Sequence, residues 1–401
     1  MLEFDEAQNL LAAAAACTGR RVQVPLAQAA GRILAADLTA TLDMPPADNS
    51  AMDGYAIRYQ DYQEGVALPI QQYCYAGDMP QPQLPGQATR LFTGSLIPTG
   101  ADTVIIQENT RVADEQVHIL HSPRTGQHVR KRGEDTSVGK RLLPAGSKLE
   151  AAHIALLASQ GLDSVPVYGA LRVGVLTTGD ELVHPGAPRA AQQIYNSNGP
   201  MLATLIQGMG AQATQVLHAR DNEADLRAAF TTLLADCDLV FSVGGVSVGD
   251  KDLVKPVLES LGGELALWKV RMKPGKPVAL AHIGGKPVVC LPGNPVSAYA
   301  VFTLLASPLI RRMQGRENLF PPIVQLTLRT DKIHQDSREE FLRVQCRSTA
   351  QGTTELVCYP QQGSGVISSM PWASGLARLP AGVAIGDGAK VAYYDLHHWL
   401  S

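Results

Sequence analysis

Apolar and polar positions alternate in regular blocks between residues 171 and 313. Short apolar runs rich in β-branched residues occur at 171–178, 211–219, 238–244 and 286–292. Stretches with helical spacing lie between them, at 199–209, 223–235 and 251–261, and an apolar helix follows the last run. Apolar strands that alternate with helices of this length are typical of a doubly wound parallel sheet. We therefore predict an α/β domain whose ligands bind beyond the carboxyl ends of its strands.

The chain on either side of this region has a different pattern of apolar runs, Pro and Gly. From Val22 to about Lys140, short β-rich runs are punctuated by Pro and Gly, which predicts an irregular β-rich domain. Helical spacing at 3–17 and 149–161 flanks that domain, so the β-rich part is predicted to be an insertion. Residues 320–401 are β-rich again and predict a small C-terminal β domain. The predicted fold class is multidomain α/β plus β.

Composition narrows the function classes. The chain has 401 residues, which predicts two to four domains, and a net charge of −3. Such a charge does not provide the global basic field of a nucleic-acid or anionic-membrane binder, so neither partner is expected. The acidic start MLEFDEA is unlike a signal peptide, and no apolar run approaches the roughly 20 residues of a membrane span.

The cysteines favour a reducing, cytoplasmic setting. The two closest, Cys346 and Cys358, lie 12 positions apart, so no pair has the spacing of zinc ligands. Cys237 and Cys290 lie at or beside apolar runs and are interpreted as reduced core residues.

The segment DLVFSVGGVSVGDKD, residues 238–252, carries the most specific chemistry. An apolar run ends in Gly244 and Gly245, followed by Gly249 and Asp252. Glycines let the backbone approach a ligand, and N–H groups that open the next helix favour an anion. Asp252 adds a carboxylate for a phosphate-bound divalent cation. Asp250 stands where a Walker loop has lysine, so the segment predicts a phosphate-and-metal site of another kind.

The ends of the other predicted strands carry candidate groups with two interpretations each. In TTGDEL (177–182), Glu181 belongs either to a phosphate site or to an ordinary capped helix start. In HARDN (218–222), Asp221 is either a helix cap or a carboxylate facing a metal or a ribose. In LPGNPVSA (291–298), Pro292 and Pro295 make either a plain helix start or a rigid turn that completes an anion pocket.

A basic cluster lies in WKVRMKPGKP, residues 268–277. If the segment is one strand, Lys269, Arg271 and Lys273 share a face, and Lys276 follows in the turn. A solvated edge strand would also carry lysines. The rigid KPGKP turn favours a positioned oxyanion site, because lysine is a suitable point charge for phosphate or a similar ion.

Three further motifs remain ambiguous from the residues alone. Asp53 in DNSAMDGYAI is either part of a turn or an exposed metal ligand or general base. Asp135 in KRGED belongs either to a surface salt bridge or to a cation site. Ser364 in QGSGVISSM is either in a flexible turn or a hydroxyl donor to a ligand.

The motifs occur in an order that closely resembles the molybdopterin molybdenumtransferase family of MoeA and the gephyrin E domain, over about residues 5–395. The motifs that carry the resemblance are DNSAMDGYA, FTGSLIPTGADTVI, KRGED, TTGDEL, NSNGPML, GGVSVGDKD, KPGKP, LPGNPVSA and GSGVISSM.

The resemblance implies four domains and a homodimer. The domains would be a discontinuous elongated linker and dimerisation domain (1–21 and 140–169), an inserted β-rich domain (22–139), the molybdopterin-binding α/β domain (170–315) and a C-terminal β-barrel-like domain (316–401). The active cleft would lie between the α/β domain of one subunit and the inserted domain of the other.

The resemblance also implies the reaction and its residues. Molybdate would be inserted into adenylylated molybdopterin, with release of AMP and a requirement for Mg²⁺. The catalytic residues would be Asp53, Asp252, Asp135 and Glu181, and the metal ligands Asp53, Asp221 and Asp252. The substrate-binding residues would be Thr93, Asp221, Gly244, Gly245, Ser247, Lys269, Lys273, Lys276, Pro292, Pro295, Arg343 and Ser364.

Two alternatives compete with the transferase. An adenylyltransferase of the preceding step would share the α/β domain, but it would not explain DNSAMDGYA or the C-terminal β domain. A non-catalytic scaffold of the gephyrin type would bind partner peptides, but the acidic residues are intact here. The adenylyltransferase and the recipient molybdoenzymes are further expected partners.

Overall fold

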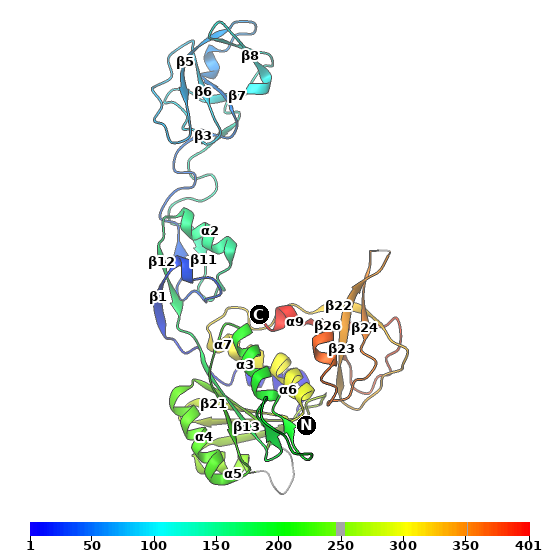
Figure 1. Ribbon diagram of the computed structural model, residues 1–401. Helices are drawn as coiled ribbons and strands as arrows, with labels where there is room; N and C mark the ends of the chain where they lie inside the picture. The colour runs from blue at the N-terminus through cyan, green and yellow to red at the C-terminus, as the bar shows by residue number, and fades with distance from the viewer. Residues whose placement is uncertain (246–252, 351) are drawn as a thin grey trace. The chain divides into compact units, whose positions relative to one another are not determined.

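The computed structural model describes residues 1–245, 253–350 and 352–401. Two predicted site residues, Ser247 and Asp252, lie outside these ranges. The described chain divides into two compact units (Figure 1). The larger unit comprises residues 1–36, 145–154 and 163–401, and the smaller unit comprises residues 37–144 and 155–162.

The predicted α/β domain is present in the larger unit. Its sheet has the strand order β16-β13-β17-β21-β20-β18. All four strands predicted from the apolar runs form its parallel part: β13 (Arg172–Thr178), β16 (Gln212–Ala219), β17 (Leu239–Val243) and β21 (Lys286–Leu291).

Two strands of this sheet were not predicted. β20 (Pro277–Ile283) pairs antiparallel with β21, and β18 (Glu264–Lys269) pairs antiparallel with β20. The turn at Gly284–Gly285 joins β20 directly to β21, and both glycines have positive φ angles. The sheet is therefore mixed, with a parallel centre and an antiparallel edge.

Helices cover both faces of the sheet, as the prediction of a doubly wound fold requires. One face packs on α4 (Glu223–Asp236) and α5 (Val254–Ser260), and the core there includes the buried side chains of Cys237 and Cys290, as predicted. The other face packs on these helical segments: α1 (Phe4–Ala12), α3 (Asn198–Gly208), α6 (Pro295–Val301), η4 (Phe302–Ala306) and α7 (Ser307–Met313). Adjacent residues of β17 alternate between these two cores, because strand side chains alternate in direction.

The N-terminal helix is shorter than predicted and joins the core of the larger unit. Phe4 of α1 is fully buried, and its ring lies 4.7 Å from that of Phe341 in the C-terminal domain. The second predicted helix is α2 (Ala151–Ser159). β1 (Arg21–Pro25), which follows α1, pairs with β12 (Ser164–Tyr168), which follows α2. Among the helices of the described chain, none is long and apolar enough to cross a membrane.

The C-terminal β domain closes into a barrel. Its sheet order is β19-β23-β24-β22-β26-β25, and a further pairing of β23 with β25 closes the ring. The strands are β19 (Met272–Lys273), β22 (Val324–Arg329), β23 (Glu339–Ser348), β24 (Thr354–Cys358), β25 (Gly375–Leu379) and β26 (Lys390–Asp395). β19 lies in the chain between β18 and β20 of the α/β sheet and includes Lys273, the first residue of KPGKP. It pairs with β23, so backbone hydrogen bonds join this segment to the barrel.

The smaller unit is a curled β sheet with the order β7-β4-β6-β5-β9-β8. Its strands are β4 (Gly54–Ile57), β5 (Leu68–Cys74), β6 (Ala88–Leu91), β7 (Thr103–Ile106), β8 (Thr110–Ala113) and β9 (Gln116–Ile119). Two short ribbons extend it, β3 (Asn49–Ser50) with β10 (Val129–Arg130) and β2 (Leu38–Thr39) with β11 (Arg141–Leu143).

Candidate functional site

A cavity of about 520 Å³ lies at the carboxyl ends of the parallel strands. We call it the strand-end cavity. Each of the four parallel strands contributes to its wall at or just after its last residue, which is where ligands bind in open α/β sheets. Five predicted site residues line it: Glu181, Asp221, Gly244, Gly245 and Pro295.

Asp221 is not the cap of α4. The side chain of Asn222 caps that helix by accepting a hydrogen bond from the Asp225 amide. Asp221 instead accepts a hydrogen bond of 2.6 Å from the Thr178 hydroxyl at the end of β13. Its backbone N–H donates to the Asp180 carboxylate at 3.2 Å. The Asp180 amide donates to Asp221 Oδ2 in return, so these two residues at neighbouring strand ends are linked. The helix-cap interpretation of Asp221 is excluded, and a role facing a metal or a ribose stays a prediction.

Gly244 and Gly245 are required by the geometry of this wall. Their φ angles are +95° and +65°, in the region that favours glycine. A Cβ atom on Gly244 would lie 2.9 Å from the Thr178 carbonyl oxygen, and one on Gly245 would lie 2.4 Å from a methyl group of Val254. The backbone of this turn therefore borders the cavity without intervening side chains.

A second cavity of about 520 Å³ adjoins the first. We call it the lysine cavity. Four residues border both cavities: Gly244, Gly245, Gly293 and Asn294. The lysine cavity brings together Lys273, Lys276, Pro292 and Ser364, all predicted to bind substrate. Asn294 donates a hydrogen bond of 3.3 Å to the Ser364 hydroxyl, so the turns of the α/β domain and the barrel meet here.

The prediction that Lys269, Arg271 and Lys273 share one face of a strand is wrong. β18 ends at Lys269, and the chain then leaves the α/β sheet. The Arg271 carbonyl accepts from the Glu339 amide, and Lys273 pairs in register with Glu340 of β23, so β19 belongs to the barrel. Lys269 is exposed and is absent from the described linings of both cavities.

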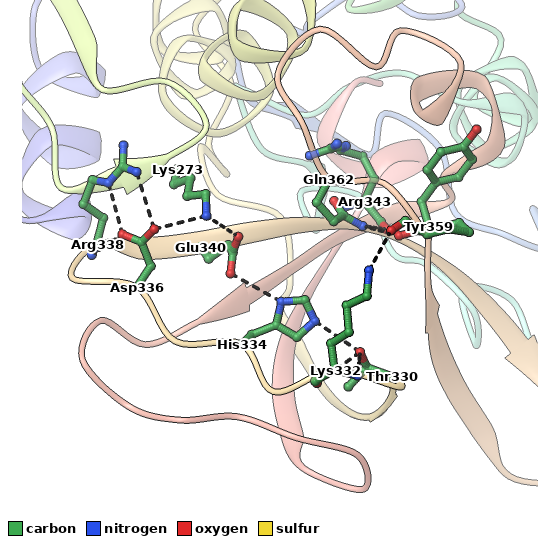
Figure 2. A network of polar contacts seen from close by, with 11 residues as sticks. Lys273, Thr330, Lys332, His334, Asp336, Arg338, Glu340, Arg343, Tyr359 and Gln362 are labelled. Atoms are coloured by element: carbon green, nitrogen blue, oxygen red, sulfur yellow. Dashed lines mark hydrogen bonds and ion pairs between the residues drawn. The ribbon is translucent and has the colours of Figure 1, made fainter.

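Lys273 is part of a network of charged side chains (Figure 2). Its ammonium lies 3.1 Å from Asp336 Oδ2 and 3.0 Å from Glu340 Oε1. Arg338, which also lines the lysine cavity, donates from Nε to Asp336 Oδ1 at 3.2 Å. Burial would lower the pKa of Lys273, but the hydrogen bonds from its ammonium to Glu340 and Asp336 outweigh burial and raise it. Lys273 is therefore charged at neutral pH.

Sequence reasoning missed Asp336, Arg338 and Glu340. Glu340 lies three residues before Arg343, which the resemblance implied as a substrate-binding residue. A signal was thus present, but the partner of Glu340 could not be known before the strand pairing of β19 with β23.

The charge of Asp336 should be visible in acid unfolding. Burial would raise its pKa, but the Arg338 side chain and amide and the Lys273 ammonium lower it to about 2. A lowered carboxyl pKa stabilises the fold above the unfolded value near 4, and this stabilisation is lost as the pH falls toward 2. The free energy of unfolding should fall between pH 5 and pH 2 in the wild type. We expect this fall to be roughly 1–2 kcal/mol smaller in Asp336→Asn. Urea unfolding across this range measures it, and identical pH profiles for both proteins would contradict it.

Arg343 lies behind the lysine cavity. It is 2% exposed, and its guanidinium donates to the Ser369 hydroxyl at 3.0 Å and to the Gly363 carbonyl at 3.0 Å. Burial lowers its pKa to about 10, so it stays charged at neutral pH. The described lining of the cavity does not include it. Its contacts hold the loop that carries Ser364.

In the smaller unit, the structure brings Asp53 and Thr93 together. Asp53 precedes β4 and Thr93 follows β6, and these strands pair with Gly54 opposite Leu91. The Thr93 amide and hydroxyl each donate to Asp53 Oδ1 at 2.8 Å. These two bonds hold the pKa of Asp53 below its usual value. Gly54 is needed beside it, because a Cβ there would lie 2.1 Å from the Ile105 carbonyl oxygen.

The KRGED loop packs against the segment before Asp53. The Lys131 ammonium pairs with Asp48 at 2.8 Å, and Arg132 Nε pairs with Asp43 at 2.6 Å. The cations of this loop therefore pair with acids of another segment. Asp135 is exposed, and its amide donates to the Met44 carbonyl.

Within residues 1–245, 253–350 and 352–401, no three His, Cys, Asp or Glu side chains form a cluster that could hold a metal ion. Asp221 borders the strand-end cavity, and the Asp180 carboxylate accepts from its amide. Mg²⁺ is usually held by one or two carboxylates together with phosphate oxygens and water. The donor chemistry of this pair therefore fits a cation that arrives with a phosphate ligand.

Comparison with known proteins identifies the family. Three family models match the chain in order: "MoeA N-terminal region (domain I and II)" at residues 2–161, "Probable molybdopterin binding domain" at 174–312 and "MoeA C-terminal region (domain IV)" at 326–396. A molybdopterin molybdenumtransferase of Nostoc sp. is 38% identical over 384 residues, covering 93% of this chain and 88% of the relative. This chain belongs to the molybdopterin molybdenumtransferase family. A family member from Haemophilus influenzae is 36% identical, with 92% of both chains covered.

A solved structure agrees with this assignment. The MoeA protein of Pyrococcus horikoshii superposes with a TM-score of 0.82 at 30% identity, covering 99% of each chain. The molybdenumtransferase resemblance drawn from the motifs is thus confirmed. The alternative of a separate adenylyltransferase does not account for the matches on either side of the α/β domain.

Proposed function

We propose that this protein inserts molybdenum into molybdopterin, using molybdate and adenylylated molybdopterin and releasing AMP. The observation that carries the proposal is the shared wall of the two cavities. Gly244, Gly245, Gly293 and Asn294 border both, so a ligand in one lies directly beside a ligand in the other. A transfer between two bound substrates requires this adjacency.

The strand-end cavity suits the diphosphate link of the adenylylated substrate. Its wall exposes the backbone of Gly244 and Gly245. The Gly244 amide donates to the Leu291 carbonyl at 3.3 Å, so the Gly245 amide is the group assigned here to phosphate oxygens. Asp180 and Asp221 would hold Mg²⁺ against the phosphates, together with Asp252. The cation would neutralise charge that develops on the phosphate oxygens during cleavage.

The lysine cavity suits molybdate, a tetrahedral dianion. Lys273, Lys276 and Arg338 supply positive charge, and Ser364 supplies a hydroxyl. Arg343 would act through the loop that it holds. The same proposal includes three further catalytic residues, Asp53, Asp135 and Glu181. It also includes Thr93 as a substrate-binding residue and a homodimeric protein.

Reconstitution tests the proposal. Purified protein is mixed with adenylylated molybdopterin, molybdate and Mg²⁺, and AMP is quantified by chromatography. We expect AMP release to require molybdate, because cleavage is coupled to metal insertion. It should also stop with EDTA, because the chelator removes Mg²⁺. AMP release at the same rate without molybdate would indicate simple hydrolysis, and no release under any condition would overturn the proposed reaction. A parallel reaction with tungstate measures the oxyanion preference.

A further inference from the structure

The ammonium group of Lys273 is held at two of its three N–H donors. Asp336 and Glu340 each accept from it, at 3.1 Å and 3.0 Å (Figure 2). Both carboxylates are shielded from water, with side-chain exposures of 17% and 10%, whereas Lys273 is 40% exposed. An ammonium has three donors, so one remains for a ligand in the lysine cavity that Lys273 lines.

The two carboxylates are themselves held from their far sides. Glu340 Oε2 lies 3.5 Å from His334 Nδ1, and His334 Nε2 lies 3.1 Å from the Thr330 hydroxyl. Asp336 Oδ1 accepts from the amide and Nε of Arg338, at 3.0 Å and 3.2 Å. Each acid therefore bridges Lys273 to another part of the barrel, and neither can rotate without breaking a second contact.

The ion pairs are not needed to join the two segments. β19 already pairs with β23 through the backbone, and the Glu339 amide donates to the Arg271 carbonyl at 3.0 Å. Lys273 keeps a side-chain exposure of 40% and lines the lysine cavity, so its charge is accessible to a ligand there. The carboxylates thus fix the direction of an accessible charge.

We infer that Glu340, together with Asp336, is a positioning residue for oxyanion binding. The inference rests on the proposed function of the lysine cavity and adds two residues that touch no substrate themselves. Glu340 and Asp336 restrict the Lys273 ammonium to one orientation and leave a single N–H directed at the bound oxyanion. Asp336 does the same for Arg338, so one carboxylate aligns two cations of the cavity wall.

A double-mutant cycle on the full-length protein tests this inference, with molybdate as the ligand in isothermal titration calorimetry. We expect Glu340→Leu to weaken binding roughly 10-fold, within the usual range of coupling between contacting residues. Glu340→Gln keeps an acceptor and should weaken binding less. In a Lys273→Met background, Glu340→Leu should have no further effect, whereas in a Lys276→Met background it should retain its full effect.

The control is Glu355→Gln. Glu355 lies on β24 of the same barrel and pairs with Arg329 at 2.6 Å, away from the described lining of the lysine cavity. This variant should bind molybdate like the wild type. If Glu340→Leu does not fold, Asp336→Asn takes its place in the same cycle.

Three outcomes separate the possible failures. Tighter binding in both Glu340 variants would show that the acid acts only as a counter-charge, and would overturn positioning. An undiminished effect in the Lys273→Met background would show a role unrelated to Lys273, and would overturn it as well. Wild-type protein that binds no molybdate would instead refute the proposed function of the cavity, on which the inference rests.

Discussion

Replacement of Asp53 with alanine is expected to lower kcat for molybdate-dependent AMP release by roughly 10³-fold, the usual contribution of a positioned acid–base group. The fold should persist, because the Asp53 side chain is partly exposed and its hydrogen bonds within the described residues are to Thr93. The two bonds from Thr93 keep the carboxylate ionised, which a role as metal ligand or general base requires. Steady-state kinetics of the reconstituted reaction measure the loss.

The Thr93→Val variant tests the same Asp53 carboxylate with a smaller change. It removes the hydroxyl donor and leaves the backbone donor in place. The pKa of Asp53 should therefore rise, and the acid limb of the kcat profile should move to higher pH. Since Asp53 is active as a carboxylate in this proposal, activity at low pH should fall while activity at neutral pH changes by about 10-fold or less.

Asp78→Ala is the matched control, because Asp78 is an exposed carboxylate of the same unit that accepts from the Tyr75 amide. It should keep wild-type kcat. Full activity in Asp53→Ala would remove this carboxylate from the mechanism. A loss in Asp78→Ala as large as that in Asp53→Ala would indicate damage to the unit rather than to a catalytic group.

Replacement of Asp238 with alanine is expected to destabilise the protein by about 3 kcal/mol. Asp238 begins the run into β17 and has a side-chain exposure of 11%. It accepts two hydrogen bonds from the Arg20 guanidinium, at 2.6 Å and 2.7 Å, and one from the Arg172 amide at 2.9 Å. Its loss leaves that amide without its acceptor. The expected effect lies at the lower end of the range for buried pairs, because Arg20 and Arg172 are each about 40% exposed and can be hydrated.

The pH dependence of this effect follows from the direction of the pKa shift. Burial would raise the pKa of Asp238, but the bonds from Arg20 and Arg172 outweigh it and hold the pKa far below the usual value. A lowered carboxyl pKa stabilises the fold above pH 4, and the stabilisation disappears as the pH falls. The difference between wild type and Asp238→Ala should therefore be largest near neutral pH and shrink under acid conditions. Denaturant unfolding at several pH values measures it.

Asp236→Ala is the control for this comparison. Asp236 lies two residues earlier and accepts from Gln215 at an exposed position. Its replacement should change stability by less than about 0.5 kcal/mol. Equal losses in both variants would contradict a specific role for the Arg20–Asp238–Arg172 cluster.

Much of the fold could be predicted because it depends on local periodicity. The four apolar runs became the four parallel strands, and the positions of their ends placed Asp221, Gly244 and Pro295 at one edge. β18 and β20 were missed because a short antiparallel edge has no helix between its strands, and KPGKP interrupts the pattern. The predicted metal set of Asp53, Asp221 and Asp252 stays a prediction, since Asp252 is outside the described residues and Asp53 belongs to the other unit.

The amino-acid sequence alone determined the fold class, the family and most of the groups at the two cavities, because repeated strand–helix units and glycine-marked strand ends are local signals. Only the tertiary structure decided which charges meet. The backbone leaves one sheet at Lys269 and enters another at Met272, and this switch brings Lys273 to Glu340, 67 positions later in the chain. Such a pairing depends on the register between two domains, which no pattern within either segment specifies.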